Sequence, residues 1–314
     1  MSQQLAVGID IGGTNTVFGI VDRRGNIISE GKIRTDHYPV VDEFVEVLHE
    51  ALMDHMEAAG LSQIKGIGIG APNGNYYTGN IEFAPNLKWK GVIPLARLVH
   101  EKFHLPTALT NDANAAAVGE MTYGAAKGMK DFIMVTLGTG VGSGFVANGQ
   151  VIYGHDGFAG ELGHVIAVRD GRPCGCGRKG CLETYTSATG VVRTAREMLQ
   201  QGRTSNLLRD DDTLTARKVF EAAGAGDKLA QDVFDYTGKI LGQSLADAVA
   251  YTSPQAIILF GGLTQAGDWL FRPTRKYMEE NLLSIYKNKV KIIPSDLREN
   301  DSAILGASAL VWEL

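Results

Sequence analysis

The residues whose types and spacing most clearly suggest chemistry lie in one short segment. It contains all three cysteines of the chain. Cys174, Cys176 and Cys181 follow His164. Zinc is held tetrahedrally by four sulfur or nitrogen ligands, and closely spaced cysteines can fold around one ion. The glycines between them allow the backbone to turn tightly. We therefore predict a structural zinc site with no open position, against the alternative of three free surface thiols.

Two glutamates flank this segment and extend its chemistry. Glu161 stands three residues before His164, and Glu183 follows two residues after Cys181. A metal at this site would bring the two carboxylates close to the ring of His164. Together these groups could hydrogen-bond the hydroxyls of a polyol. The second ring nitrogen of His164 would be free to reach outward. The alternative for each glutamate is an exposed carboxylate without a ligand.

Two glycine-rich turns follow apolar stretches, one in each half of the chain. Backbone amides at such turns approach anions closely, and Asp10 could hold the water shell of a metal ion. The alternative is a hairpin in which glycine supplies a positive φ. No lysine follows the glycines, which excludes the common lysine-containing phosphate loop. The candidate phosphate residues are Asp10, Gly12, Gly13, Thr14, Gly138, Thr139 and Gly140, with Gly261 and Gly262 as a third approach, toward a nucleoside.

Asn111 and Asp112 stand where a short apolar strand is expected to end and an alanine-rich helix to begin. Asn or Asp at such a place commonly caps the helix. A carboxylate at the mouth of a sheet can instead take a proton from a substrate hydroxyl. The sequence leaves both interpretations of Asp112 open.

The apolar pattern predicts an α/β chain in which each half opens with a strand, a glycine turn and another strand. The expected strands are 5–10, 17–21, 27–33, 64–69, 107–109, 132–137, 145–147, 151–153, 256–260 and 290–293. The expected helices are 39–59, 94–103, 112–123, 269–286 and 302–313, with helical patterns dominating 184–251. Residues 73–90 and 169–180 are expected to be loops, and 138–144 a turn.

The composition is that of a globular protein rather than a membrane or nucleic-acid-binding one. The 314 residues are 44% hydrophobic, carry a net charge of −5 and include 39 glycines. This length predicts two lobes. No stretch reaches the ~18 apolar residues that a membrane span needs, and no signal peptide is visible. Three clustered cysteines argue against a disulfide framework. We expect a cytoplasmic protein.

Taken together, these motifs resemble the ROK family of repressors, open reading frames and sugar kinases. The similarity rests on the segments that begin at Asp10, Asn111, Leu137, Glu161 and Cys174, in that order. It implies the two-lobed, actin-like (ribonuclease-H-like) ATPase fold, with mixed sheets and an interlobe cleft. The expected lobes are residues 1–122 with 301–314, and residues 123–300.

The resemblance implies a transferase of carbohydrate metabolism that phosphorylates a hexose with ATP. The expected reaction is that of a glucokinase, a step of glycolysis in which the 6-hydroxyl of glucose is phosphorylated. Asp112 would be the general base. Sugar contacts would come from Asn86, Asn111, Asp112, Glu161, His164 and Glu183, while Gly12, Gly13, Thr14, Gly138, Thr139 and Gly140 would cradle phosphates. Gly261 and Gly262 would lie by the adenosine, and Mg²⁺ near Asp10. The zinc ligands would be His164, Cys174, Cys176 and Cys181.

Two departures from the family pattern leave alternatives open. Thr16 and Val17 follow Asn15 where many members carry a basic residue, and the segment from Gly70 to Asn75 differs from commoner versions. An N-acetylglucosamine or N-acetylmannosamine kinase is the alternative enzyme, and a non-catalytic sugar sensor the alternative of another class. Repressors of the family carry an additional N-terminal DNA-binding domain. The first strand is expected at Leu5 and the chain is acidic, so we expect no nucleic-acid partner. A homodimer is expected.

Overall fold

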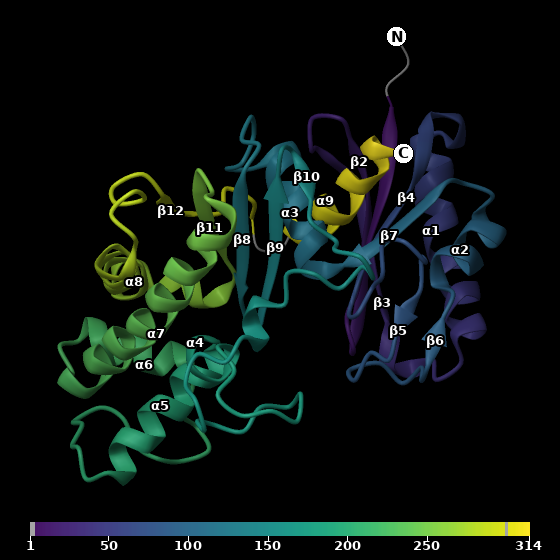
Figure 1. Cartoon of the computed structure of the whole chain (residues 1–314). Coiled ribbons are helices and arrows are strands. Elements are labelled where there is room, and N and C mark those ends of the chain that lie inside the picture. Colours follow the sequence, from purple (N-terminus) through teal and green to yellow (C-terminus); the bar gives the residue numbers. More distant parts are fainter. Residues whose placement is uncertain (1–3, 299–300) are drawn as a thin grey trace. The chain divides into compact units, whose positions relative to one another are not determined.

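The structure is a computed structural model that describes residues 4–298 and 301–314, and its chain divides into two units (Figure 1). Unit one comprises Met1–Met129, Gly144–Gly160 and Ser295–Leu314, and unit two comprises Lys130–Ser143 and Glu161–Pro294. The described helices include none that is both long enough and apolar enough to cross a membrane.

Unit one contains residues 123–129, 144–160 and 295–298, which lie outside the first lobe expected from the sequence. A Cβ at Gly144 would lie 2.8 Å from the Cβ of Ala117 and 3.0 Å from the carbonyl oxygen of Ala113. This close approach packs the segment 144–160 with unit one. The lobe boundaries at 122/123 and 300/301 stay a prediction. The expected lobes also contain residues 1–3 and 299–300, which lie outside the described residues.

Unit one is built on a mixed five-stranded sheet in the order β3-β2-β1-β4-β7. Strands β1, β2 and β3 are antiparallel neighbours, whereas β4 and β7 run parallel to β1. The strands are β1 (Leu5–Ile11), β2 (Asn15–Asp22), β3 (Ile27–Arg34), β4 (Ile64–Ala71) and β7 (Thr107–Asn111). A small hairpin joins β5 (Ile81–Glu82) to β6 (Val92–Ile93).

Helices pack against both faces of this sheet (Figure 1). Leu5, Val7 and Ile9 of β1 enter an apolar core with Phe44 and Leu48. This core is covered by α1 (Val41–Ala59) and α2 (Leu95–Phe103), while α3 (Asp112–Tyr123) and α9 (Ser302–Ala309) lie on the other side.

Strand glycines account for part of the glycine excess in the sequence. A Cβ at Gly8 would collide with the carbonyl oxygen of Ile304, and one at Gly68 with that of Ala307. Glycine at these positions therefore lets α9 lie directly on β1 and β4. A 3₁₀ turn at Leu310–Glu313 follows α9.

The second sheet has the order β10-β9-β8-β11-β12. Its strands are β8 (Phe132–Leu137), β9 (Val141–Ala147), β10 (Gln150–Val151), β11 (Ala256–Phe260) and β12 (Lys291–Pro294). Strand β11 pairs in parallel with both β8 and β12. The carboxyl ends of β8 and β11 therefore lie at the same edge of unit two.

Three of the five helices described in unit two begin at a side chain that accepts a hydrogen bond from a backbone amide of the first turn. The five are α4 (Glu183–Thr186), α5 (Ala188–Gln200), α6 (Ala216–Gly224), α7 (Lys228–Thr252) and α8 (Asp268–Asn281). Ser187 caps α5, Thr215 caps α6 and Asp227 caps α7.

Several elements begin or end elsewhere than the sequence predicts. The glycine turn ends at Gly140, because buried Val141 already begins β9. Strand β10 ends at Val151, since Tyr153 instead stacks on Tyr76. Helix α8 ends at Asn281, where the following residue becomes extended. The helical stretch of 184–251 is interrupted at 201–215, and the loop 73–90 contains β5.

Candidate active site and metal centre

Two carboxylates, Asp10 and Asp112, come together at one edge of the unit-one sheet. In the parallel pairs Asp10 stands opposite Gly70, and Ala71 stands opposite Asn111. The carboxyl ends of β1, β4 and β7 therefore meet. A Cβ at Gly70 would lie 3.2 Å from Oδ1 of Asp10 and 3.7 Å from Cα of Asp112. Glycine keeps the space beside both acids free of a side chain.

The surroundings of the two acids favour their neutral forms. Burial, and secondly the charge of Asp112, raise the pKa of Asp10 to about 7. Burial also raises the pKa of Asp112, although the amide of Ala113 offsets part of this effect by donating to Oδ1 at 2.8 Å. Protein atoms crowd the Asp112 carboxyl, yet the residue stays accessible to solvent. An accessible carboxylate with a raised pKa is a suitable proton acceptor.

Asn111 settles which of the two neighbouring residues caps α3. Its Oδ1 accepts from the amides of Ala113 and Asn114, at 2.8 and 3.3 Å. Asn111 is therefore the N-cap, and Asp112 is the first residue of the helix. The capping interpretation considered for Asp112 applies to Asn111 instead, which leaves the Asp112 carboxylate available for chemistry.

The first glycine turn lies against the segment that contains Asn86. A Cβ at Gly13 would lie 2.5 Å from the carbonyl oxygen of Asn86. The amide of Gly12 donates to the carbonyl oxygen of Asn15 at 2.9 Å, which closes the turn, and Thr14 is exposed at its tip. The structure thus brings Asn86 to Gly13, two residues that the sequence separates widely.

The second glycine turn lies beside the third one in unit two. Phe260 stands opposite Thr136 in the parallel pair of β11 and β8, so the turns that follow these strands are neighbours. Gly261 has φ +104°, and a Cβ there would lie 2.7 Å from the carbonyl oxygen of Leu137. Gly261 and Gly262 therefore join the turn at 138–140, as a shared ligand would require.

A pocket of about 620 Å³ opens next to this turn in unit two. Its lining residues are Thr139, Ala188, Thr189, Val192, Arg193, Arg196, Leu214, Thr215 and Ala216. Thr189 donates from Oγ1 to the carbonyl oxygen of Thr139 at 2.8 Å, which ties the start of α5 to the turn. Apart from Thr139, the sequence analysis missed these residues. They come from α5, α6 and the segment before α6, and no local motif marks them.

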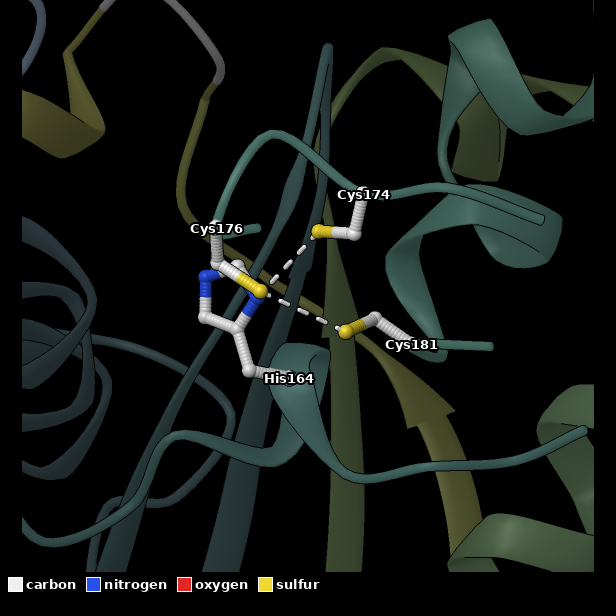
Figure 2. A group of neighbouring side chains, drawn as sticks. All are labelled: His164, Cys174, Cys176 and Cys181. Carbon is white, nitrogen blue, oxygen red and sulfur yellow. Dashed lines mark hydrogen bonds between the residues drawn. The ribbon is translucent and has the colours of Figure 1, made fainter. Parts of the chain in front are cut away.

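Four side chains converge in the predicted metal centre (Figure 2). The potential ligand atoms of His164, Cys174, Cys176 and Cys181 all lie within 4.8 Å of one another. Nδ1 of His164 is 3.7 Å from Sγ of Cys174, and the sulfurs of Cys176 and Cys181 are 3.6 Å apart. Bonds of ~2.3 Å from zinc to sulfur place tetrahedral ligands about 3.8 Å apart.

The donor set therefore fits a four-coordinate zinc ion. Three sulfurs and one imidazole nitrogen are ligands that zinc prefers, and together they fill a tetrahedral site. A hydrogen bond from the backbone amide of Arg178 is the main cause that lowers the pKa of Cys176 to about 6, which favours the thiolate that binds metal. Because Nδ1 of His164 faces the sulfurs, its Nε2 is the ring nitrogen left for a ligand.

The glutamates beside the metal centre are positioned by short helical turns. Glu161 precedes the 3₁₀ turn Leu162–His164, and its carbonyl oxygen accepts from the amide of His164 at 3.1 Å. The carboxylate of Glu183 lies 3.0 Å from Sγ of Cys174 through Oε1. Its Oε2 would lie 2.9 Å from a Cβ at Gly140. Glu183 thus links the metal centre to the second glycine turn.

The predicted site residues consequently form two groups, one within each unit. Unit one holds Asp10, Gly12, Gly13, Thr14, Asn86, Asn111 and Asp112. Unit two holds Gly138, Thr139, Gly140, Glu161, His164, Cys174, Cys176, Cys181, Glu183, Gly261 and Gly262. Carboxylates and a glycine turn define the first group, and a metal centre, two glycine turns and a pocket define the second.

Comparison with known proteins places this chain in a family. The profile of the ROK family matches residues 6–313. The protein therefore belongs to the ROK family, which confirms the resemblance found in the motifs.

Its curated relatives include glucokinases of similar length. A glucokinase from Halalkalibacterium halodurans is 37% identical over 320 residues, which cover 99% of this chain and 96% of that protein. A glucokinase from Streptomyces coelicolor is 34% identical over 318 residues, which cover 98% of each.

Among solved structures, a ROK family glucokinase from Streptomyces griseus in complex with glucose and AMPPNP matches with a TM-score of 0.80. It is 32% identical, and the match covers 99% of this chain and 100% of that one. The predicted α/β class with mixed sheets and the actin-like ATPase fold are thereby confirmed. The interlobe cleft stays a prediction.

Proposed function

We propose that this protein is an ATP-dependent glucokinase, which transfers the γ-phosphoryl group of MgATP to the 6-hydroxyl of D-glucose. The observation that carries the proposal is the accessible carboxylate of Asp112, held at the sheet edge beside a glycine turn. The glucokinases to which the chain is similar support glucose as the acceptor, and the glucose and AMPPNP complex supports ATP as the donor.

Asp112 is the general base of the proposed reaction. The 6-hydroxyl oxygen attacks the γ-phosphorus, its proton passes to the Asp112 carboxylate, and ADP leaves. The raised pKa of Asp112 strengthens it as a proton acceptor in this step. The other sugar contacts come from Asn86, Asn111, Glu161, His164 and Glu183. Since Oδ1 of Asn111 caps α3, its amide nitrogen is the atom that faces a hydroxyl.

The glycine turns and the pocket beside α5 bind the nucleotide in this proposal. Gly12, Gly13 and Thr14 contact phosphates, as do Gly138, Thr139 and Gly140, and Gly261 and Gly262 lie by the adenosine. The pocket of about 620 Å³ is large enough for a nucleoside. Asp10 would lie near Mg²⁺ held by the phosphates, and the ion would supply positive charge to offset theirs.

Zinc is structural in the proposal, because its four ligands leave no position for substrate. Its ligands tie His164, and with it Glu161, to the cysteine loop that ends at Glu183, so these side chains are presented together. Metal analysis of freshly purified protein should give one zinc per chain, and protein that folds and works without stoichiometric zinc would contradict this part.

The proposal includes a homodimer in the cytoplasm, with no nucleic-acid partner. The net charge of −5 supports the last point, because nucleic-acid binding requires basic surfaces. Light scattering measures the oligomeric state directly, and a monomer at working concentration would contradict the dimer.

The deciding experiment is an ADP-release assay with MgATP and a series of hexoses: glucose, mannose, fructose, N-acetylglucosamine and N-acetylmannosamine. The Asp112→Asn variant removes the base and keeps the shape of the side chain. Asp54→Asn, at an exposed position of α1, is the matched control. We expect kcat with glucose to fall by about 10²-fold or more in Asp112→Asn, with glucose binding retained, and to stay unchanged in the control.

Each outcome of this assay has a distinct meaning. Preference for glucose in kcat/KM supports the glucokinase assignment. Preference for an N-acetylated sugar keeps the chemistry and changes the substrate. Sugar binding without any ADP release would favour the sensor, and an unchanged kcat in Asp112→Asn would overturn the assignment of the base.

A further inference from the structure

One buried amide side chain, that of Asn75, connects two loops of unit one that are 81 residues apart in sequence. Only 2% of Asn75 is exposed. Its Nδ2 donates to the carbonyl oxygen of Asp156 at 2.7 Å. Its Oδ1 accepts from the backbone amides of Tyr77 and Thr78, at 3.0 and 3.3 Å. Each half of the side chain therefore fastens a different loop.

Neighbouring groups strengthen this connection. Gly157 has φ +90°, and a Cβ there would collide with the Asn75 amide, so the backbone of the second loop lies directly on it. The rings of Tyr76 and Tyr153 are stacked, with centroids 4.1 Å apart and planes inclined by 3°. The Tyr77 hydroxyl donates to the carbonyl oxygen of Gly154 at 2.9 Å.

The first of these loops lies against the strand that leads to the proposed base. A Cβ at Gly74, the residue before Asn75, would collide with the carbonyl oxygen of Thr110. Thr110 lies on β7 immediately before Asn111, and Asp112 follows as the first residue of α3. The position of the loop at Asn75 is therefore fixed relative to the base.

The second loop leads directly to the proposed sugar-binding glutamate. Residues 156–160 pack within unit one, and the next residue of the chain is Glu161, followed by His164. The hydrogen bond from Asn75 to Asp156 thus sets where the chain leaves unit one on its way to both side chains.

We propose that Asn75 is a positioning residue for the sugar, which acts by holding the segment that delivers Glu161 and His164. The inference rests on the proposed hexose kinase function. Its side chain is hydrogen-bonded to backbone groups of the two loops, so it works through them and not by touching the substrate. A displacement of about 1 Å in such supporting structure can cost about 10²-fold in rate.

The sharpest test is Asn75→Asp, because it changes one half of the side chain only. The remaining Oδ1 still accepts from Tyr77 and Thr78, whereas the new oxygen repels the carbonyl oxygen of Asp156. Asn73→Asp is the matched control. It loses a comparable bond, from Nδ2 to the carbonyl oxygen of Glu82 at 2.9 Å, in the same loop but away from Asp156.

We expect Asn75→Asp to raise the KM for glucose by about tenfold or more while the KM for ATP changes less than about twofold. Hydrogen exchange should become faster at 154–160 and stay slow at Tyr77 and Thr78. In the control, both KM values should stay near those of the wild type. A merely structural role would instead lower the active fraction, and so kcat, with both KM values unchanged.

The measurements separate failure of this inference from failure of the proposed function. Wild-type protein that phosphorylates no hexose overturns the function and, with it, the positioning role. Active wild-type protein with an unchanged glucose KM in Asn75→Asp, despite faster exchange at 154–160, overturns the positioning role alone. Unchanged exchange in that variant would show that the bond does not hold the segment.

Discussion

The two turns that follow β1 and β8 share a glycine-rich sequence, but their glycines serve different purposes. In unit one, a Cβ at Gly13 would lie 2.5 Å from the carbonyl oxygen of Asn86. In unit two, a Cβ at Gly138 would meet no atom within 4 Å. Neither glycine is among the residues with positive φ. The first turn requires glycine at position 13 because another backbone lies against it, whereas the space beside Gly138 is open.

This difference teaches that similar glycine-rich sequences can form a turn packed against another segment or a turn with an open surface. The turn of unit one is held by the segment that carries a proposed sugar contact, Asn86. The turn of unit two borders the pocket of about 620 Å³ proposed for the nucleotide. Substitutions of glycines in the two turns should therefore separate effects on stability from effects on ATP binding.

The two turns also differ in charge. Asp10 stands two residues before Gly12 of the first turn, whereas the uncharged Thr136 stands two residues before Gly138 of the second. We expect this difference to have the largest effect on stability. Burial raises the pKa of Asp10 to about 7 from its ordinary value of 3.8. The folded state therefore keeps a proton that the unfolded state has already released, and stability falls as the pH rises from about 4 to about 7. Asp10→Asn cannot ionise and should be more stable than the wild type above this range, by up to about 4 kcal/mol.

Urea unfolding at about pH 5 and about pH 8, without nucleotide, measures this difference. The gain of Asp10→Asn over the wild type should be larger at the higher pH. Asp54→Asn, on the exposed face of α1, should show no such pH dependence. An equal gain at both pH values would contradict the raised pKa.

Gly13→Ala should have the next largest effect. Its methyl group would press on a backbone oxygen, which cannot rotate away as a side chain would, so the segment around Asn86 must shift. We expect a loss of about 1–3 kcal/mol in the free energy of unfolding. A lower kcat/KM for glucose should accompany it, since Asn86 moves. If stability and glucose kinetics both stay at wild-type values, the first turn is not buttressed in this way.

The sequence predicted those elements whose signals are local. Strands β8 and β11 begin and end as expected, because their apolar runs are bounded by turn residues. The cysteine cluster could be predicted because the spacing of ligands around one ion is itself a local property. The parallel pairing of β1, β4 and β7 brings Asp10 near Asp112, a proximity that only the sheet topology shows.

What the sequence did not predict depends on contacts between distant segments. Gly142 and Gly144 suggested a turn, yet they lie in β9, where Gly144 allows close packing on α3. Tyr153 continued an apolar pattern, but it leaves the strand to stack on Tyr76. The pocket beside Thr139 is assembled from two helices that carry no motif.

Gly140→Ala is expected to have a smaller effect than Gly13→Ala, because its neighbour is flexible. The new methyl group would lie 2.9 Å from Oε2 of Glu183, the far end of a side chain that can rotate. The free energy of unfolding should fall by less than about 1 kcal/mol. The KM for glucose should rise several-fold as the carboxylate moves. An unchanged KM would indicate that Glu183 does not contact the sugar.

Gly138→Ala should have the smallest effect on stability and is therefore the cleanest probe of the second turn. Nothing lies near the new methyl group, so the free energy of unfolding should change by no more than about 0.5 kcal/mol. If phosphates approach this backbone, the methyl group must stand in their way and raise the KM for ATP, while the KM for glucose stays near the wild-type value. Steady-state kinetics with each substrate varied in turn measures both. An unchanged KM for ATP in a stable variant would mean that the open surface at Gly138 faces solvent rather than the nucleotide, and the comparison between the two turns would lose its functional half.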